Sequence, residues 1–181
     1  MRYLYGKDWE QHLEMKMLEC DRSKRKAYIC SPLSAFTDDE ALRNMHIARA
    51  YMYYVIERMG YLAKAPHAYL PILLCDKIPV ERAIALKYGL SLLETCELLL
   101  VCGKRISDGM RGEIAHAAKL RMPVYTFHKD VYYEVIEEVR RNKGDVNMVY
   151  LDTNHPLLSH THPTTNLEWL RLPVSDRKSV V

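Results

Sequence analysis

Five short apolar segments recur along the chain, and each has the length of a buried strand. They lie at residues 27–30, 65–71, 97–102, 124–127 and 148–151. Pro66 and Pro71 lie within the second segment, and we expect them to fix its end because proline lacks a backbone N–H. The pattern of short apolar segments therefore predicts five strands.

Longer stretches between these strands carry apolar residues at helical spacing. The expected helices are 38–59, 79–95, 109–120 and 131–141. Gly60 and Gly144 follow two of them as stop signals, and Pro79 suits the first turn of another. Strands that alternate with helices predict a parallel sheet with helices on both faces. The expected fold class is an α/β, Rossmann-like sheet of five parallel strands in the flavodoxin-like order 2-1-3-4-5.

The two ends of the chain differ from this central pattern. Residues 7–21 carry apolar side chains at loosely helical spacing, which predicts a short amphipathic helix. The last thirty or so residues contain three prolines and many polar residues, as is typical of an irregular tail. We expect an N-terminal helical extension at 1–25, one α/β domain at 26–151 and a C-terminal tail at 152–181.

Composition narrows the class of protein. The 181 residues suit one domain, and 49% hydrophobic with 27% charged residues is ordinary for a globular chain. A net charge of +3 without a concentrated basic face argues against a nucleic-acid polymer as partner. Five cysteines without a C-x-x-C pair argue against a disulfide framework. Because the sequence shows neither a signal peptide nor a membrane-spanning apolar stretch, we expect a cytoplasmic location and no membrane partner.

The third expected strand runs directly into a helix start, which is a place where α/β proteins bind anions. Ser107 is the natural N-cap, and Gly109 lets a ligand approach the backbone closely. Glu113 follows about one turn inside the helix. Capping leaves Glu113 unexplained, because the capping-box partner of Ser107 would be Met110. Glu113 is therefore either an acid that complements the helix dipole or a nucleophile directed at a bound ligand.

Other polar residues leave alternatives open at this stage. Ser31 and Ser34 follow the first strand, and they either hold a phosphate or sugar hydroxyl or form a serine turn. His67 either contacts a ligand or is a hydrogen-bonded core histidine. Glu81 and Arg82 lie near a helix start, where they either form an exposed ion pair or face the site.

We expect neither a cofactor nor a metal. The glycine-containing loop after the third strand matches neither the dinucleotide-binding nor the P-loop motif. Glu113-x-x-His116 has the spacing of carboxylate-bridged metal sites, but a second such motif on a facing helix is absent from the sequence. His155, His160 and His162 cluster in the expected tail, and an exposed polar tail explains them without a metal.

Several of these residues, taken in order, resemble the nucleoside 2-deoxyribosyltransferase-like superfamily, and most closely its bacterial and phage branch. The resemblance covers about residues 26–128 and rests on Tyr28-Ile29-Cys30-Ser31-Pro32-Leu33-Ser34, Asn44, Ala48, Ala65-Pro66-His67, Glu81-Arg82, Leu92-Leu93, Ile106-Ser107, Gly109-Met110, Glu113-Ile114 and Ala117. The ordered set is more specific than any single part of it.

The resemblance implies a chemistry for Glu113. In this superfamily a glutamate at that position attacks C1′ of a deoxyribose, displaces the base and holds the sugar covalently. A carboxylate is a competent nucleophile toward an oxocarbenium-like centre, and two successive displacements retain configuration. Water as the acceptor would give an N-glycosidase, and a second nucleobase would give a transferase.

The resemblance also implies a nucleoside 5′-monophosphate as ligand. Where this chain has Ser107, the transferases carry an aspartate and the related deoxynucleoside 5′-monophosphate N-glycosidases carry a phosphate-binding serine. The residues expected to bind phosphate or substrate are Ser107, Gly109, Met110, Ser31, Pro32, Ser34 and His67. The transferase's base-handling acid has no obvious counterpart, and Asp76, Glu81 and Asp108 are unranked substitutes. A neighbouring subunit often completes the site in this superfamily, so we expect a homodimer or larger homo-oligomer.

Two other classes of function remain at this stage. One is a module that binds a nucleotide or nucleotide-derived signal in the same pocket without turnover. The other is a structural or interaction protein, in which Glu113 only complements the helix dipole. Such a protein would show no ligand-dependent rise in melting temperature.

Overall fold

The protein is built on one sheet of five parallel strands in the order β2-β1-β3-β4-β5. The computed structural model describes residues 25–32 and 37–152. Its strands are β1 (Lys26–Cys30), β2 (Leu62–Lys64), β3 (Leu98–Val101), β4 (Val124–Thr126) and β5 (Val149–Leu151). The expected α/β fold and strand order are confirmed.

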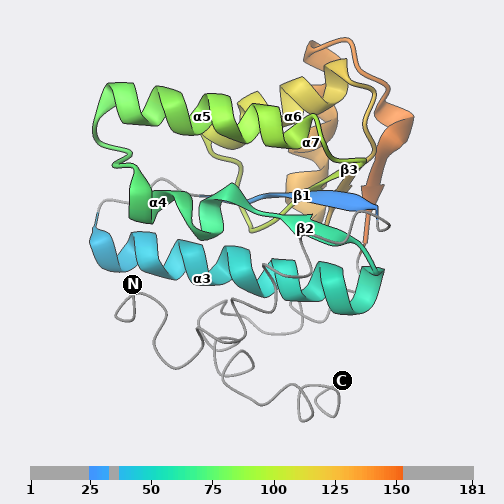
Figure 1. Ribbon diagram of the computed structural model, residues 1–181. Coiled ribbons are helices and arrows are strands. Elements are labelled where there is room, and N and C mark those ends of the chain that lie inside the picture. Colours follow the sequence, from blue (N-terminus) through green and yellow to red (C-terminus); the bar gives the residue numbers. More distant parts are fainter. Residues whose placement is uncertain (1–24, 33–36, 153–181) are drawn as a thin grey trace.

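Helices cover both faces of this sheet (Figure 1). On one face lies α3 (Asp38–Tyr54), which continues into a π-helical segment at Val55–Met59. The other face carries α5 (Pro79–Leu93), α6 (Asp108–Lys119) and α7 (Lys129–Arg141). The sequence predicts these helices, and Gly60 ends the first of them in a left-handed conformation with φ of 70°.

Alternate residues of β1 face opposite sides of the sheet, and this alternation divides the core into two clusters. Ala27 and Ile29 pack in the cluster that contains α3. Tyr28 and Cys30 pack in the cluster that contains α6 and α7. All four side chains are fully buried. Tyr28 and Cys30 therefore lie beneath the helix that carries Glu113.

The second strand lies outside the segment that the sequence predicts for it. β2 ends at Lys64, and residues 65–71 are not a strand. They form instead a 3₁₀ turn at Pro66–Ala68 and the start of α4 (Leu70–Leu73). Each proline occupies a first helical turn, where its missing N–H costs no hydrogen bond. His67 consequently lies on a turn just beyond the carboxyl end of the sheet.

Some expectations fall on parts of the chain that the structure does not describe. The amphipathic helix expected at 7–21, Ser34 and the tail after Asp152 all lie outside the described residues. Within the described residues, no helix combines the length and the apolar character needed to span a membrane. The four described cysteines are free thiols, and all but Cys75 are buried.

Candidate active site

The loops that follow β1 and β3 meet at the carboxyl edge of the sheet, as expected for a topological switch point. The backbone N–H of Cys102 donates to the carbonyl of Cys30 at 2.8 Å. Gly103 follows with φ of 95°, and a Cβ atom there would lie 3.3 Å from Cδ of Pro32. Pro32 therefore packs against the loop that leads into α6, and it sets the spacing of the two loops.

The start of α6 has the cap that the sequence predicts. Ser107 is the N-cap, and its hydroxyl oxygen accepts a hydrogen bond from the N–H of Met110 at 3.4 Å. The hydroxyl proton of Ser107 is not used in this bond and can still be donated to an anion. The Met110 side chain is fully buried in the core, and its backbone N–H is the group that the Ser107 hydroxyl caps.

Gly109 lies in the first turn of α6, on the side where α5 approaches. A Cβ atom at Gly109 would lie 4.0 Å from both Cδ2 of Leu86 and the hydroxyl oxygen of Ser107. Asp108, the acid of this turn, is exposed. The first turn of α6 therefore combines a serine hydroxyl, backbone amides and one apolar neighbour from α5.

Glu113 is buried in the second turn of α6, with 5% of its surface exposed. Its Oε1 accepts a hydrogen bond from the hydroxyl of Tyr28 at 2.6 Å. The same oxygen lies 3.6 Å from Nε2 of His67. Its Oε2 is also buried, yet it has no hydrogen-bond partner among the described residues. A buried carboxylate oxygen without a donor is rare in folded proteins and points to a functional role.

His67 is held in one orientation by the loop after β1. Its Nδ1 lies 2.6 Å from the carbonyl oxygen of Ser31. A carbonyl can only accept, so Nδ1 carries the proton and donates it. Nε2 of the same ring then faces Glu113. The turn created by the two prolines thus brings His67 to the carboxylate, where it is both hydrogen-bonded and directed into the site.

The Tyr28 hydroxyl and the Cys30 thiol near Glu113 are held in their protonated form. Burial raises the pKa of the Tyr28 hydroxyl well above its ordinary value, and the charge of Glu113 raises it further. Burial also raises the pKa of the Cys30 thiol, with Glu113 as the second cause. Tyr28 therefore remains a hydrogen-bond donor over the physiological pH range and fixes one oxygen of the carboxylate.

Ser31 adds a second unsatisfied group at the same edge of the sheet. The residue is fully buried, and its Oγ has no hydrogen-bond partner in the part of the chain that the structure describes. Its carbonyl is already used by His67. A buried hydroxyl without a partner costs stability unless a ligand or water pairs with it.

Three structural contributors to this site were not predicted from the sequence. Tyr28 binds Glu113, and Gly89 of α5 lies against both residues. Arg49 of α3, 6% exposed, donates from Nη2 to the carbonyl of Ala68 at 3.2 Å and so holds the turn that carries His67. A tyrosine inside a buried strand and a glycine inside a helix are both signals of a specific partner or a close approach.

Glu81 and Arg82 do not form the ion pair that was one expectation for them. Arg82 pairs with Asp76 at 2.5 Å. Glu81 accepts from the backbone N–H of Cys75 at 2.5 Å. Asp76 and Glu81 line a separate cavity of about 290 Å³ between α4 and the first turn of α3. These two candidates for a base-handling acid are therefore engaged in the connection between α4 and α5.

The two residues of the Glu113-x-x-His116 motif on α6 have different partners. His116 pairs through Nε2 with Glu94 of the neighbouring α5–β3 connection at 2.9 Å, whereas Glu113 faces Tyr28 and His67. No group of three or more potential metal ligands exists among the described residues. The three histidines of the expected tail lie outside them.

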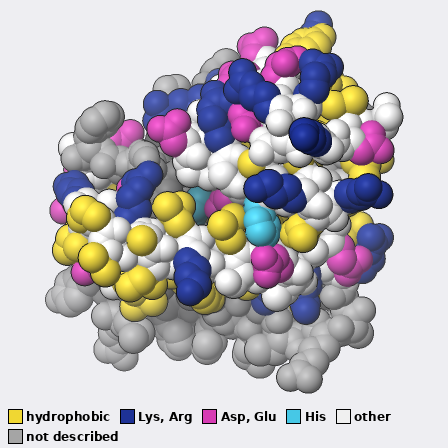
Figure 2. All heavy atoms as spheres, turned by 90° about the horizontal axis from the view of Figure 1, so that it is seen from above, with side chains coloured by type: hydrophobic (Ala, Val, Ile, Leu, Met, Phe, Trp, Pro, Cys, Tyr) yellow, Lys and Arg dark blue, Asp and Glu magenta, His cyan; other side chains and the backbone are white. Residues whose placement is uncertain are grey.

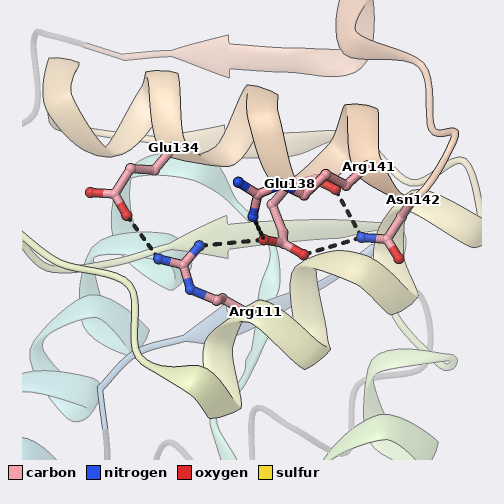
Figure 3. A network of polar contacts seen from close by, with 5 residues as sticks. All are labelled: Arg111, Glu134, Glu138, Arg141 and Asn142. Atoms are coloured by element: carbon pink, nitrogen blue, oxygen red, sulfur yellow. Dashed lines mark hydrogen bonds and ion pairs between the residues drawn. The ribbon is translucent and has the colours of Figure 1, made fainter.

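A network of charged and polar side chains fixes α6 against α7 (Figure 3). Glu138 accepts hydrogen bonds from Arg111 at 3.3 Å, Arg141 at 3.4 Å and Asn142 at 3.2 Å. Arg111 also contacts Glu134 at 3.3 Å. Because Arg111 lies on α6 two residues before Glu113, the network anchors the turn that presents the carboxylate.

The fold and the site define a class of protein: an α/β protein with a buried carboxylate and a capped helix start at the switch point of a parallel sheet. A family model described as "Domain of unknown function (DUF7768)" matches residues 25–127, which is more than half of the chain. The chain belongs to this family. Comparisons with curated proteins and with solved structures gave no match.

Proposed function

We propose that this protein acts on the N-glycosidic bond of a (deoxy)nucleoside 5′-monophosphate, with Glu113 as the nucleophile. One observation carries the proposal: a buried carboxylate whose Oε1 is held by Tyr28 while its Oε2 has no partner among the described residues. The residues that resemble the nucleoside 2-deoxyribosyltransferase-like superfamily support it.

The spacing along α6 suits a nucleotide. Ser107 and Glu113 are six positions apart, which corresponds to about 9 Å along the helix axis. A phosphate at the first turn would accept hydrogen bonds from the Ser107 hydroxyl and from backbone amides near Gly109. A pentose then spans the distance to the carboxylate, and the buried hydroxyl of Ser31 offers it a further hydrogen bond.

The reaction follows from the chemistry of a carboxylate. An oxygen of Glu113 forms a bond to the anomeric carbon while the bond to the base breaks, and the electron pair leaves with the base, which takes up a proton. The sugar is then held as an ester of Glu113. Water releases it as a free sugar phosphate, and a second nucleobase would release it as a new nucleotide.

Incubation with a panel of deoxynucleoside and nucleoside monophosphates, followed by chromatography for free base, tests this function. We expect at least one nucleotide to release its base, and Glu113→Gln to lower the rate at least about 100-fold. Glu94→Gln is the matched control, because Glu94 is an exposed acid paired with His116. Absence of base release from every nucleotide, or unchanged release by Glu113→Gln, would overturn the proposal.

A binding module without turnover is the second candidate. It is favoured by the engagement of Asp76 and Glu81 elsewhere, which leaves the exposed Asp108 as the remaining candidate for a base-handling acid. In that case calorimetry would detect a nucleotide that binds tightly, and chromatography would recover it intact. A nucleotide that raises the melting temperature of the protein without being cleaved would support the binding module over the enzyme.

We also propose that the protein forms a homo-oligomer. The outer face of α5 exposes Val80, Ile84 and Tyr88, at 70%, 52% and 45%. Figure 2 looks down on this side of the molecule and shows hydrophobic side chains gathered along α5. Exposed apolar stripes are typical of association surfaces, and α5 also borders Glu113 through Gly89. Light scattering tests the homo-oligomer by measuring the molar mass of wild type and of Ile84→Glu in solution. We expect a lower mass for the variant, and an equal mass would contradict the proposal.

A further inference from the structure

Gly89 lies inside α5, one turn before its end, on the side that faces the sheet, and it is buried. Glycine inside a helix is less favourable than alanine, because it loses more backbone freedom on folding. A buried helical glycine therefore signals a close approach by another part of the chain. The neighbours of Gly89 show which part this is.

A Cβ atom at Gly89 would lie 3.0 Å from the hydroxyl oxygen of Tyr28 and 3.7 Å from Oε1 of Glu113. It would also lie 4.0 Å from Cγ of Pro66, the residue before His67. The first distance is too short for an ordinary carbon–oxygen contact. Tyr28 cannot move away easily, because its side chain is fully buried and its hydroxyl is bound to Glu113.

We infer that Gly89 is a positioning residue, which leaves the space in which the Tyr28 hydroxyl can reach Glu113. Because Gly89 has no side chain, α5 packs closely against the hydrogen bond between Tyr28 and Glu113. This close packing leaves no space for other positions of the Tyr28 ring. The bond keeps Oε1 occupied and leaves Oε2 for a ligand. The catalytic part of this inference rests on the proposed function, whereas the packing part does not.

Thermal melting tests the packing part without any substrate. The four variants are Gly89→Ala, Gly112→Ala, Tyr28→Phe and the double variant of Tyr28→Phe with Gly89→Ala. Gly89→Ala is expected to lower the melting temperature by about 4 °C or more, since the new methyl group displaces Tyr28. Gly112→Ala is the matched control on α6, where a Cβ atom meets nothing within 4 Å, and it should melt at or above the wild-type temperature. In a Tyr28→Phe background, where the clashing oxygen is gone, Gly89→Ala should cost at most half as much.

Activity tests the positioning part, once a nucleotide that releases its base has been found. Gly89→Ala should lower kcat at least about tenfold and change KM less than about threefold, because the contacts at the start of α6 remain. In the Tyr28→Phe background, where the hydrogen bond is already lost, Gly89→Ala should lower kcat little further. A purely structural glycine would instead leave the kcat of the folded protein unchanged in both backgrounds.

The two failures are distinguishable. Equal losses of melting temperature from Gly89→Ala in the wild-type and Tyr28→Phe backgrounds would overturn the inference, whatever the protein does to nucleotides. A wild-type protein that cleaves no nucleotide would overturn the proposed function and the catalytic part, and the melting data would still decide the packing part. An unchanged kcat in Gly89→Ala would overturn the positioning role.

Discussion

The hydroxyl of Tyr28 donates a 2.6 Å hydrogen bond to Oε1 of Glu113 and so joins two residues that lie 85 positions apart in the chain. Tyr28→Phe removes a donor from a buried carboxylate and should lower the free energy of unfolding by about 1–3 kcal/mol. Urea denaturation measures this change. Tyr133→Phe is the control, because Tyr133 is 56% exposed, and it should change stability by less than about 0.5 kcal/mol. Equal effects of the two substitutions would contradict the assigned bond.

Stability should fall in alkaline solution through the buried thiols. Burial raises the pKa of Cys96 from 9.0 to about 11. The folded state therefore keeps a proton that the unfolded state loses, so this contribution is complete below pH 9 and disappears as the pH rises to 11. The loss amounts to about 1.4 kcal/mol per pH unit.

Cys96→Ala isolates this contribution from those of other groups. The variant should be less stable than wild type at pH 8, and the difference should shrink by about 2–3 kcal/mol between pH 9 and pH 11. Urea titrations at several pH values measure it. A difference that stays constant over this range would show that Cys96 titrates alike in the folded and unfolded protein.

Glu138 should contribute more to stability than its neighbour in the same network. Its side chain is 11% exposed and accepts from three donors, whereas Glu134 is 46% exposed and pairs only with Arg111 among the described residues. Glu138→Ala should cost about 1–3 kcal/mol, and Glu134→Ala less than about 0.5 kcal/mol. Chemical denaturation compares the two. Similar losses would mean that the network adds nothing beyond ordinary surface pairs.

Ser107 should affect both the helix start and the affinity for phosphate. Ser107→Ala loses an N-cap, which costs about 1 kcal/mol of stability, and Thr37→Ala loses the equivalent cap of α3, where Thr37 accepts from the N–H of Glu40. Only Ser107→Ala should weaken binding of a nucleoside monophosphate, by about tenfold or more.

Calorimetry with a nucleotide and its unphosphorylated nucleoside separates these two effects. The nucleoside should bind wild type and Ser107→Ala with similar affinity, because it lacks the group that Ser107 contacts. Equal weakening for both ligands, or equal weakening by Thr37→Ala, would show that Ser107 acts on binding only through the stability of a helix.

The alternation of strands and helices could be predicted from local signals, and the strand order followed from the fold class that this alternation indicates. Buried strands form continuous apolar runs, and Gly60 and Pro79 mark helix ends through the backbone conformations they favour. The second strand could not be placed in this way, because the apolar run at 65–71 suits a strand as well as a short helix. In the folded chain, Pro66 and Pro71 each lie in the first turn of a short helix. The apolar pattern alone does not distinguish this arrangement from a strand.

The site could be predicted only in part, for a similar reason. Ser107 and Glu113 are singled out by one local junction, and the structure places Ser107 at the N-cap of α6 and Glu113 in its second turn. The contacts of Glu113 depend on how α5, α6 and the turn of His67 are rotated about their axes, and no local pattern fixes those rotations. The pairing of Arg82 with Asp76 instead of Glu81 likewise depends on the path of the α4–α5 connection.

Covalent capture of the sugar on Glu113 tests the central claim most directly. The protein is incubated with a cleavable deoxynucleoside monophosphate or with its 2′-fluoro analogue, whose sugar is released slowly from the enzyme. Intact-protein mass spectrometry and peptide mapping then locate any bound sugar. We predict a mass gain of one sugar phosphate on the peptide that contains Glu113, and no gain in Glu113→Gln. An unmodified protein that has released free base, or a modification on another residue, would contradict the account.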